Sequence, residues 1–185
     1  MLSDEKLALA IQQGNADALR GLVERHHSLL LGYLYRLTDG NCPLADDLAQ
    51  ETFIRVLNGI AGYKYPHPFK PWLYAIATNL ARDYFKSAAV RHTMMLDSEA
   101  ELQEDENGHV ETNLLEAGDA EKVVGALHRL PDHQREVVIL RFYQDLSLAE
   151  IAATLDLPIG TVKSRLCLGL RRLRDILEHQ AFSEK

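Results

Sequence analysis

The sequence predicts an all-α protein in which two small helical domains are joined by a flexible acidic linker. Apolar residues recur at spacings of three and four along most of the chain, which is the period of an amphipathic helix. Polar cap residues and Gly or Pro separate these periodic segments. Residues 92–120 lose the periodicity and are rich in acids, as in segments too polar to bury a core. We therefore expect domains at residues 1–91 and 121–185, with the linker at 92–120.

Length and composition exclude several classes of protein. The 185 residues are enough for two small domains that each bury a modest core. Cys42 and Cys167 are the only cysteines, so neither a disulfide framework nor a cysteine-rich zinc site is expected, which suits a reducing cytosol. No stretch approaches about 18 apolar residues and the first residues carry acids, so we expect neither a membrane span nor a signal peptide. The composition indicates a cytoplasmic protein without membrane insertion, cofactor or metal.

Charge is distributed unevenly along the chain. The formal net charge is −7, but residues 97–121 hold ten acids and no Lys or Arg. The rest of the chain carries 20 basic and 17 acidic side chains and is mildly basic. Because phosphate contacts dominate the affinity of proteins for nucleic acid, this balance is weak support for a protein that holds DNA unaided. A partner that supplies most of the affinity would resolve the difficulty.

Two helices are expected at the start of the chain. Ser3 caps the first and Asn15 caps the second. The second helix has one apolar face, formed by Leu19, Leu22, Val23, Leu30, Tyr33, Leu34 and Leu37. His26 falls on that face with no Cys or carboxylate at ligand spacing, so core packing is favoured over metal binding. Residues 39–41 then break the helix.

The third helix, about Leu44 to Asn58 with Pro43 in its first turn, has two distinct faces. One is apolar and expected to be buried: Leu48, Ala49, Thr52, Phe53, Val56 and Leu57. The other combines acidic, amide and apolar side chains: Asp47, Gln50, Glu51 and Ile54. A mixed face of this kind suggests a protein partner, although an ordinary solvated face fits the same pattern.

A stiff loop and a fourth helix follow. Residues 59–71 contain three prolines together with Tyr63, Tyr65, His67 and Phe69. Aromatic rings near Lys64 and Lys70 can stack unpaired bases at roughly 1 to 3 kcal/mol per base, although the same rings can equally well pack in a core. The fourth helix, about Pro71 to Ala89, is expected to face inward with Trp72, Ile76, Ala77, Leu80 and Tyr84. Its polar or basic positions are Asn79, Arg82 and Lys86, and Arg91 lies just beyond its expected end.

The C-terminal third of the chain predicts a helix-turn-helix. Ser147 and Glu150 have the spacing of a capping box, which starts a short helix. Asp156 tolerates a left-handed turn, and Pro158 disfavours helix at the residue before it, so that helix stops there. Two further helices expected between residues 121 and 143 complete a small bundle.

The second helix of this motif, from Gly160 to about His179, has an apolar and a basic face. Its apolar stripe is Val162, Leu166, Leu170 and Leu173. The outward positions at the same spacing are Gly160, Lys163, Ser164, Cys167 and Arg171. Five basic residues and no acid lie between residues 161 and 174. This face fits a DNA major groove, with Arg side chains near phosphates, while a helical hairpin with a solvated basic face is the alternative.

Three blocks of sequence stand together at spacings that a helix-turn-helix alone does not explain: DDLAQETFIRVL at 46–57, PWLYAIATNLARDYF at 71–85, and LPDHQREVVILRFYQDLSLAEIAATLDLPIGTVKSRL at 130–166. In these blocks the chain resembles a bacterial RNA polymerase sigma factor of the extracytoplasmic function (ECF) group of the sigma-70 family. The resemblance is close to full length. It implies a non-enzymatic alternative sigma factor that binds core RNA polymerase and directs promoter-specific initiation of transcription. Residues 1–91 would then form sigma domain 2, a four-helix bundle, and residues 121–185 sigma domain 4.

The resemblance also implies three sets of site residues and a set of partners. The helix that docks on the beta and beta-prime subunits of the polymerase would use Asp47, Gln50, Glu51 and Arg55. Capture of the unpaired minus-10 element would use Tyr63, Lys64 and Asn79, with Arg82 and Lys86 on phosphates and Trp72 bracing the loop. The recognition helix would read the minus-35 duplex with Lys163, Ser164 and Cys167 at base edges and Thr161, Arg165, Arg171 and Arg172 near phosphates. An anti-sigma factor is expected as a further partner.

Two other functions compete with this interpretation. A stand-alone helix-turn-helix regulator would bind a duplex operator without polymerase, but residues 46–57 and 71–85 would then have no role. An enzyme is disfavoured because no nucleophile and base pair, phosphate-cradling glycine loop or metal spacing occurs in the sequence. Within the family pattern, the proline-rich loop leaves open the choice of Tyr63 over Tyr65, and the redox roles of the two cysteines also stay open.

Overall fold

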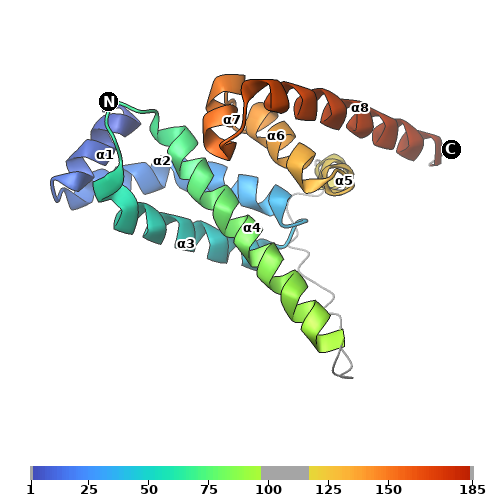
Figure 1. The fold of residues 1–185 in the computed structure, drawn as a ribbon, viewed down its shortest axis with the longest axis horizontal. Coiled ribbons are helices and arrows are strands. Elements are labelled where there is room, and N and C mark those ends of the chain that lie inside the picture. The colour runs from blue at the N-terminus through green and yellow to red at the C-terminus, as the bar shows by residue number, and fades with distance from the viewer. Residues whose placement is uncertain (1, 97–116, 184–185) are drawn as a thin grey trace.

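The structure is a computed structural model that describes residues 2–96 and 117–183. Over those residues it has eight α-helices, one 3₁₀ helix and no β-strand (Figure 1). The elements are α1 (Asp4–Gln12), α2 (Ala16–Leu37), α3 (Cys42–Gly59), η1 (Ile60–Gly62), α4 (Phe69–Leu96), α5 (Ala117–His128), α6 (Asp132–Phe142), α7 (Leu148–Leu155) and α8 (Ile159–Ser183). The predicted all-α fold is therefore confirmed. No helix in the described part is long and apolar enough to cross a bilayer.

The first three helices each begin at a capping side chain, of which Ser3 and Asn15 were predicted. Ser3, Asn15 and Asn41 each accept a hydrogen bond from the backbone N–H three residues later, at 3.4, 3.1 and 3.0 Å. These bonds satisfy N–H groups that have no partner within the helix. Pro43 lies in the first turn of α3, where its missing N–H leaves no helical bond unmade.

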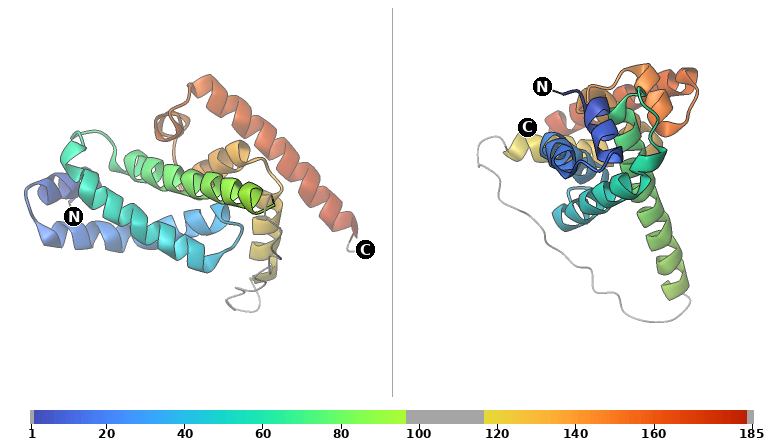
Figure 2. Two further views of the ribbon diagram at one scale, coloured as in Figure 1. Left: turned by 60° about the horizontal axis from the view of Figure 1, so that its bottom comes forward. Right: turned by 90° about the vertical axis from the view of Figure 1, so that its left-hand side faces the viewer.

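Helices α1 to α4 form the first domain, in which α2, α3 and α4 share one core (Figure 1). Its fully buried large side chains include Leu22, Leu30, Tyr33, Leu34, Phe69, Leu73 and Tyr74. The Tyr33 hydroxyl lies 2.7 Å from the Thr78 hydroxyl, so this buried polar group is satisfied. The C-terminal half of α4 extends well beyond the bundle (Figures 1 and 2).

Helices α5 to α8 form the second domain, in which α8 packs on α5, α6 and α7. Its core consists of Ala126, Leu127, Leu130, Val137, Val138, Ile139, Leu140, Leu146, Ile151, Leu155 and Val162. At the crossing of α6 and α8, a Cβ added to Gly169 would lie 3.0 Å from Cγ2 of Val138. The absence of a side chain at Gly169 is thus what lets these two helices approach.

The two domains also pack directly against each other, with α7 on α4 and α6 on α2 (Figure 2). Tyr74 is fully buried, and its hydroxyl donates to the side-chain oxygen of Gln144, which is itself 3% exposed. The amide nitrogen of Gln144 donates to the backbone oxygen of Leu29 at 3.3 Å. Burial raises the pKa of the Tyr74 phenol above its ordinary value. This interface therefore contains a buried polar network that joins both domains.

Charged groups cross the same interface. Arg82 of α4 donates from two guanidinium nitrogens to the two carboxylate oxygens of Glu136 in α6, at 2.7 and 2.6 Å. Arg135 of α6 lies 2.6 Å from a carboxylate oxygen of Asp39, at the end of α2. The Arg36 guanidinium sits 4.0 Å from the ring centroid of Tyr143. The domains are thus held by specific contacts as well as by the intervening chain.

The structure differs from the sequence-based expectations at a few positions. Helix α4 continues through Leu96 and α5 begins at Ala117, so helix covers both ends of the expected linker at 92–120. Residues 97–116, which hold the rest of the expected linker, lie outside the described residues. Leu57 was expected to be buried but is 41% exposed, because it falls at the edge of the apolar face of α3. Tyr84 was also expected to be buried but is 40% exposed, because it lies beyond Ala81, in a stretch of α4 where residues 82–87 are all exposed.

Candidate nucleic-acid interface

The predicted helix-turn-helix is formed by α7, a short turn and α8. The Ser147 hydroxyl accepts from the backbone N–H of Glu150 at 3.2 Å, while the Glu150 carboxylate accepts from the backbone N–H of Ser147 at 2.8 Å. The capping box is thus confirmed. Asp156 takes the left-handed conformation at φ 52°, as expected for the residue that ends α7. The hydrogen bonds with Ser147 lower the pKa of the Glu150 carboxyl below its ordinary value.

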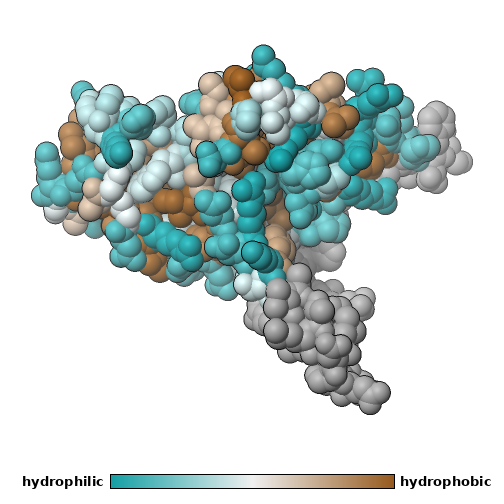
Figure 3. All heavy atoms as spheres, in the orientation of Figure 1, coloured by the Kyte–Doolittle hydropathy of each residue, from teal (hydrophilic) through white to brown (hydrophobic). Residues whose placement is uncertain are grey.

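One face of α8 is exposed and basic. Gly160, Lys163, Ser164, Cys167 and Arg171 are all exposed, as the helical spacing predicts. Arg172 is exposed too, whereas Thr161 and Arg165 are half-buried beside this face. In Figure 3, the surface over α8 mixes hydrophilic and apolar side chains near α7 and is mostly hydrophilic further along the helix. Lys and Arg side chains at these positions are suited to contact phosphates, and Ser164 and Cys167 are exposed between them.

The opposite face of α8 seats the helix on its domain. Val162 is buried, and Leu166 and Leu173 pack against the core. Leu170, which we placed in the apolar stripe, is instead 36% exposed and lines a shallow apolar groove with Leu127, Val138 and Phe142. The seam passes through Gly169, whose closeness to α6 the sequence pattern did not reveal.

The mixed face of α3 is exposed as predicted. Asp47, Gln50 and Arg55 are exposed, and the apolar side chain of Ile54 is 51% exposed among them. Glu51 is half-buried, and its carboxylate accepts a hydrogen bond from Arg55 at 3.0 Å. An isolated ion pair at this exposure contributes little to stability. This face carries more carboxylates than basic groups, so it lacks the positive charge that attracts phosphates.

Tyr63 is not available at the surface of the loop between α3 and α4. Its side chain is buried, and its ring lies 5.2 Å from Trp72 and 6.0 Å from Phe69 between centroids. Its hydroxyl donates to the backbone oxygen of His67. Burial, together with nearby Glu5 and Asp4, raises the pKa of Tyr63 to about 12. Tyr63 therefore packs inside the loop, against the half-buried Trp72.

Tyr65, unlike Tyr63, is exposed on this loop. The backbone N–H of His67 donates to the oxygen of Lys64 at 2.9 Å, which closes a tight turn around a cis peptide bond between Tyr65 and Pro66. Tyr65 is 48% exposed at the tip of this turn, beside the exposed Lys64. An exposed ring next to a lysine is suited to stacking an unpaired base.

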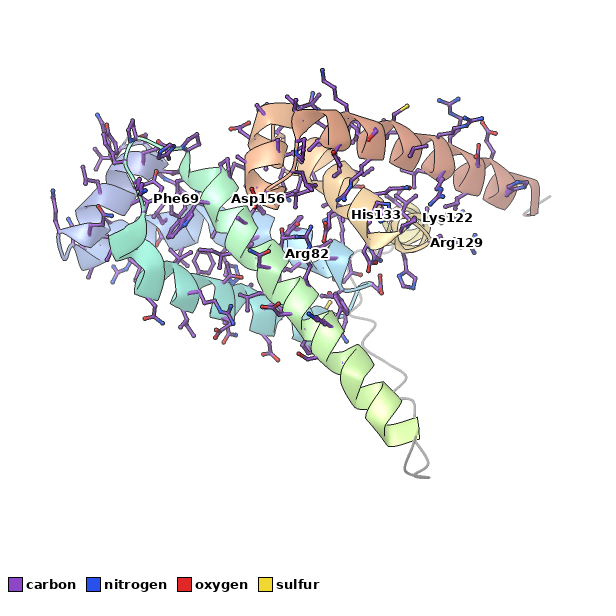
Figure 4. The ribbon with its side chains drawn as sticks, viewed as in Figure 1. Phe69, Arg82, Lys122, Arg129, His133 and Asp156 are labelled. Carbon is purple, nitrogen blue, oxygen red and sulfur yellow. The ribbon has the colours of Figure 1, made fainter. Side chains whose placement is uncertain are left out.

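The polar residues of α4 differ in how accessible they are to a ligand. Asn79 and Lys86 are exposed. Arg82, labelled in Figure 4 at the middle of α4, pairs with Glu136, whose side chain is only 6% exposed. This bidentate pair raises the pKa of Arg82 and occupies its guanidinium. The sequence pattern did not identify Glu136 as its partner, because the two residues lie 54 positions apart in different domains.

A metal site is not evident in the described residues. No group of three or more His, Cys, Asp or Glu side chains there is placed to hold an ion. His26 is buried against the ring of Phe69, and its Nε2 lies 2.8 Å from a carboxylate oxygen of Asp4. Its role in the described structure is packing and hydrogen bonding.

Two parts of the chain match models of one protein family. Residues 22–91 match the model for Sigma-70 region 2, and residues 126–175 match that for Sigma-70, region 4. The chain is 32% identical over 176 residues to the ECF RNA polymerase sigma factor SigW of Bacillus subtilis, covering 89% of this chain and 91% of that relative. It is also 32% identical over 190 residues to the ECF RNA polymerase sigma-E factor of Haemophilus influenzae, covering 97% and 95%.

Two solved structures share the fold. CnrH, in complex with the cytosolic domain of CnrY, matches with a TM-score of 0.72 and 24% identity over 95% of this chain and 97% of CnrH. The sigma factor RpoE of Bartonella quintana, in complex with the anti-sigma factor NepR, matches with a TM-score of 0.67 and 24% identity over 86% and 98%.

The fold and the two family models define a helical protein with Sigma-70 regions 2 and 4 and a helix-turn-helix in its second domain. The sequence comparisons make the assignment more specific: the chain belongs to the ECF sigma factors of bacterial RNA polymerase. The resemblance seen in the sequence alone is thereby confirmed.

Proposed function

We propose that this chain is an alternative sigma factor that binds core RNA polymerase and directs promoter-specific initiation by reading minus-35 duplex and minus-10 unpaired DNA. The observation that carries the proposal is that two unlike exposed faces occur in one chain. The face of α8 is basic, whereas the face of α3 around Asp47 and Ile54 is acidic and apolar. A stand-alone regulator needs only the first. No covalent step is assigned to this chain, because the polymerase performs the chemistry in the cytoplasm.

Polymerase docking is assigned to the mixed face of α3. Asp47 and Gln50 supply exposed polar groups, and the Glu51 and Arg55 pair lies beside them. Ile54, 51% exposed, supplies the apolar area that a protein interface buries. Docking here leaves the basic face of α8 free, since that face belongs to the other domain. The beta and beta-prime subunits are the proposed partners.

Capture of the minus-10 element is assigned to the α3 to α4 loop and the polar side of α4. Tyr65 takes the base-stacking role first considered for Tyr63, because the ring of Tyr63 is buried. Lys64, Asn79 and Lys86 are exposed around the path that an unpaired strand would follow. Flipping and unstacking a base costs a few kcal/mol, which stacking and polar contacts offset. Arg82 joins this set only when it leaves Glu136.

Reading of the minus-35 element is assigned to α8. Lys163, Ser164 and Cys167 face outward from its N-terminal half, the part of a recognition helix that reaches base edges. Thr161, Arg165, Arg171 and Arg172 flank them and are assigned to phosphates. An anti-sigma factor that covers these surfaces is the further partner that we propose from membership of the family.

Run-off transcription tests the proposed function. Purified core polymerase is incubated with a promoter library, with and without the protein, and start sites are mapped. The double variant Asp47→Ala, Gln50→Ala is compared with Glu24→Ala, Gln13→Ala, which changes an exposed acid and an exposed amide outside the α3 face. Start sites that require the protein, weaken in the first variant and persist in the second support the proposal. If no start site depends on the protein while it still shifts duplex DNA, the stand-alone regulator is correct.

A further inference from the structure

Helix α1 contacts both ends of the loop that carries Tyr65. The loop leaves α3 through η1 (Ile60–Gly62) and enters α4 at Phe69. Side chains from α1 reach its first backbone carbonyls and its last backbone N–H. Helix α1 lies outside residues 22–91, the segment matched by the Sigma-70 region 2 model. The contacts therefore come from a helix to which no role has been assigned.

Gln12, the last residue of α1, is bonded to the start of the loop. Its side-chain nitrogen donates to the backbone oxygen of Ile60 at 2.6 Å and to that of Tyr63 at 2.8 Å. A side-chain amide has two N–H donors, and both are used here. The two carbonyls bracket η1, so Gln12 fixes the direction in which the chain enters the turn around Tyr65.

Glu5, in the first turn of α1, is bonded to the end of the loop. Its carboxylate accepts from the backbone N–H of Phe69 at 3.3 Å. This N–H is the first of α4 and has no acceptor within the helix, so a carboxylate there is favoured both by the bond and by the helix dipole. Figure 4 labels Phe69 where the loop meets α4.

Helix α1 is itself anchored to the bundle. Asp4 lies 2.9 Å from a guanidinium nitrogen of Arg25 and 2.8 Å from Nε2 of His26, both on α2. The His26 ring packs against Phe69 with 5.6 Å between centroids. A displacement of α1 would therefore break contacts with α2 as well as with the loop. This makes α1 a rigid support rather than a loosely attached end.

We propose that Gln12 is a positioning residue for minus-10 recognition: it holds the loop so that Tyr65 is presented to an unpaired base. The inference rests on the proposed function. A loop held in its binding conformation avoids the cost of ordering it when the base arrives. Loss of the Gln12 bonds should thus reduce capture of the melted strand while docking on polymerase and reading of minus-35 persist. The bond to Ile60 touches only the C-terminal end of α3, away from Asp47 and Gln50, and α8 belongs to the other domain.

The test compares Gln12→Glu and Gln12→Leu with Gln13→Glu in the holoenzyme. Gln13→Glu places the same charge one residue later at an exposed position, and so controls for charge at the end of α1. Permanganate reactivity of unpaired thymines measures the open complex, and a single-stranded minus-10 oligonucleotide measures capture directly. Both Gln12 variants are expected to reduce the two signals by about tenfold, the effect of losing two part-buried hydrogen bonds to backbone carbonyls. Gln13→Glu should stay within about twofold, as surface changes usually do.

A double-variant comparison separates positioning from simple destabilisation. If Gln12 acts through Tyr65, the loss caused by Gln12→Leu should largely disappear in a Tyr65→Ala background, because residues that act as one unit are not additive. Additive losses, or Gln12 variants that match Gln13→Glu, would overturn the inference. So would a loss that falls equally on core affinity and minus-35 binding. A failure of the proposed function would give a different result from a failure of this inference. In that case even the unsubstituted protein would produce no start site that requires it.

Discussion

At the residue scale, the capping box of α7 is the clearest link between sequence and stability. The Ser147 hydroxyl and the Glu150 carboxylate each accept a bond from the other's backbone N–H. Replacing Ser147 with Ala should lower the free energy of unfolding by about 1 kcal/mol, because an N–H of the first turn loses its acceptor. Urea titration followed by circular dichroism measures the change. Ser28→Ala, at an exposed position within α2, should leave stability within about 0.5 kcal/mol.

The same cap should make stability depend on pH. Hydrogen bonds with Ser147 lower the pKa of Glu150 in the folded protein. The unfolded chain then binds the proton more readily, so the ionised carboxylate stabilises the fold at neutral pH and this contribution is lost as pH falls through the folded pKa. Glu150→Gln should be less stable than the original at pH 7, and the gap should close in acid. A gap of constant size across a pH series of urea titrations would contradict this.

Substitutions of Tyr63 and Tyr65 should affect different properties: stability for Tyr63, and binding of unpaired DNA for Tyr65. Tyr63 is buried against Trp72 and Phe69, so Tyr63→Ala should cost about 3 to 5 kcal/mol, as for other large aromatic side chains in a core. Tyr65 is 48% exposed, so Tyr65→Ala should change stability by less than about 0.5 kcal/mol while weakening binding of a minus-10 single strand. Thermal unfolding measures the change in stability, and binding of a minus-10 oligonucleotide measures the change in DNA affinity. A stable Tyr63→Ala variant would contradict the assignment.

The sequence alone could not distinguish these two tyrosines. They stand two positions apart in one proline-rich loop, and each has lysine beside it or nearby. What buries one and exposes the other is the path of the backbone, which depends on Gln12, about fifty residues earlier. Side-chain caps act within four residues and were therefore predictable, whereas a bond between distant segments leaves no local pattern.

At the element scale, helix boundaries followed local chemistry closely. Ser3, Asn15 and Ser147 cap the helices they were expected to cap. Asn41 was expected only to break α2, and it also caps α3. Helix α4 runs past its expected end because no Gly or Pro occurs between Trp72 and Leu96, and a rise in polarity alone does not stop a helix. Which face of a helix touches its neighbour was less predictable, since α8 packs through Gly169 rather than through Leu170.

The crossing of α6 and α8 gives a prediction with a matched control. Gly169→Leu places a side chain where a Cβ alone would lie 3.0 Å from Val138, so overpacking should destabilise the protein by about 1 to 3 kcal/mol. Gly125→Leu makes the same change at an exposed position of α5, where a Cβ meets nothing within 4 Å. There, the better helix propensity of Leu should stabilise by about 0.5 kcal/mol. Equal effects in urea titrations would show that Gly169 is not a packing requirement.

At the scale of the whole molecule, the packing of the two domains was not predictable from periodicity. Gln134, Arg135 and Glu136 are buried although they look like solvated positions of α6 in the sequence. Glu136 and Arg135 are covered by the other domain, which supplies Arg82 and Asp39 as their partners. Gln134 instead packs against Gly169 of α8 within its own domain. Amphipathic patterns report that a face is apolar, but a polar face that docks on another domain resembles one that faces water.

Domain contact also constrains how the protein reads a promoter. Elements named minus-10 and minus-35 are about 25 base pairs apart, or about 85 Å along the duplex. Domains that touch through Tyr74 and Gln144 cannot lie over both elements at once. Promoter binding by both domains therefore requires that they separate. Separation would also release Arg82 from Glu136 to reach the minus-10 strand.

The Arg82 and Glu136 pair gives the test of this closed arrangement. In Arg82→Ala, the Glu136 carboxylate, 6% exposed, would be left buried without its bidentate partner, and separation of the domains would return it to water. The free protein should then become more extended, with a larger radius of gyration in small-angle X-ray scattering. Lys86→Ala, one turn further along α4, leaves the pair intact and should stay compact. The exchanged pair Arg82→Glu, Glu136→Arg should restore compactness, because it rebuilds an ion pair between α4 and α6 with the two charges exchanged. An unchanged radius in Arg82→Ala would mean that apolar packing between α4 and α7 holds the domains together without this pair.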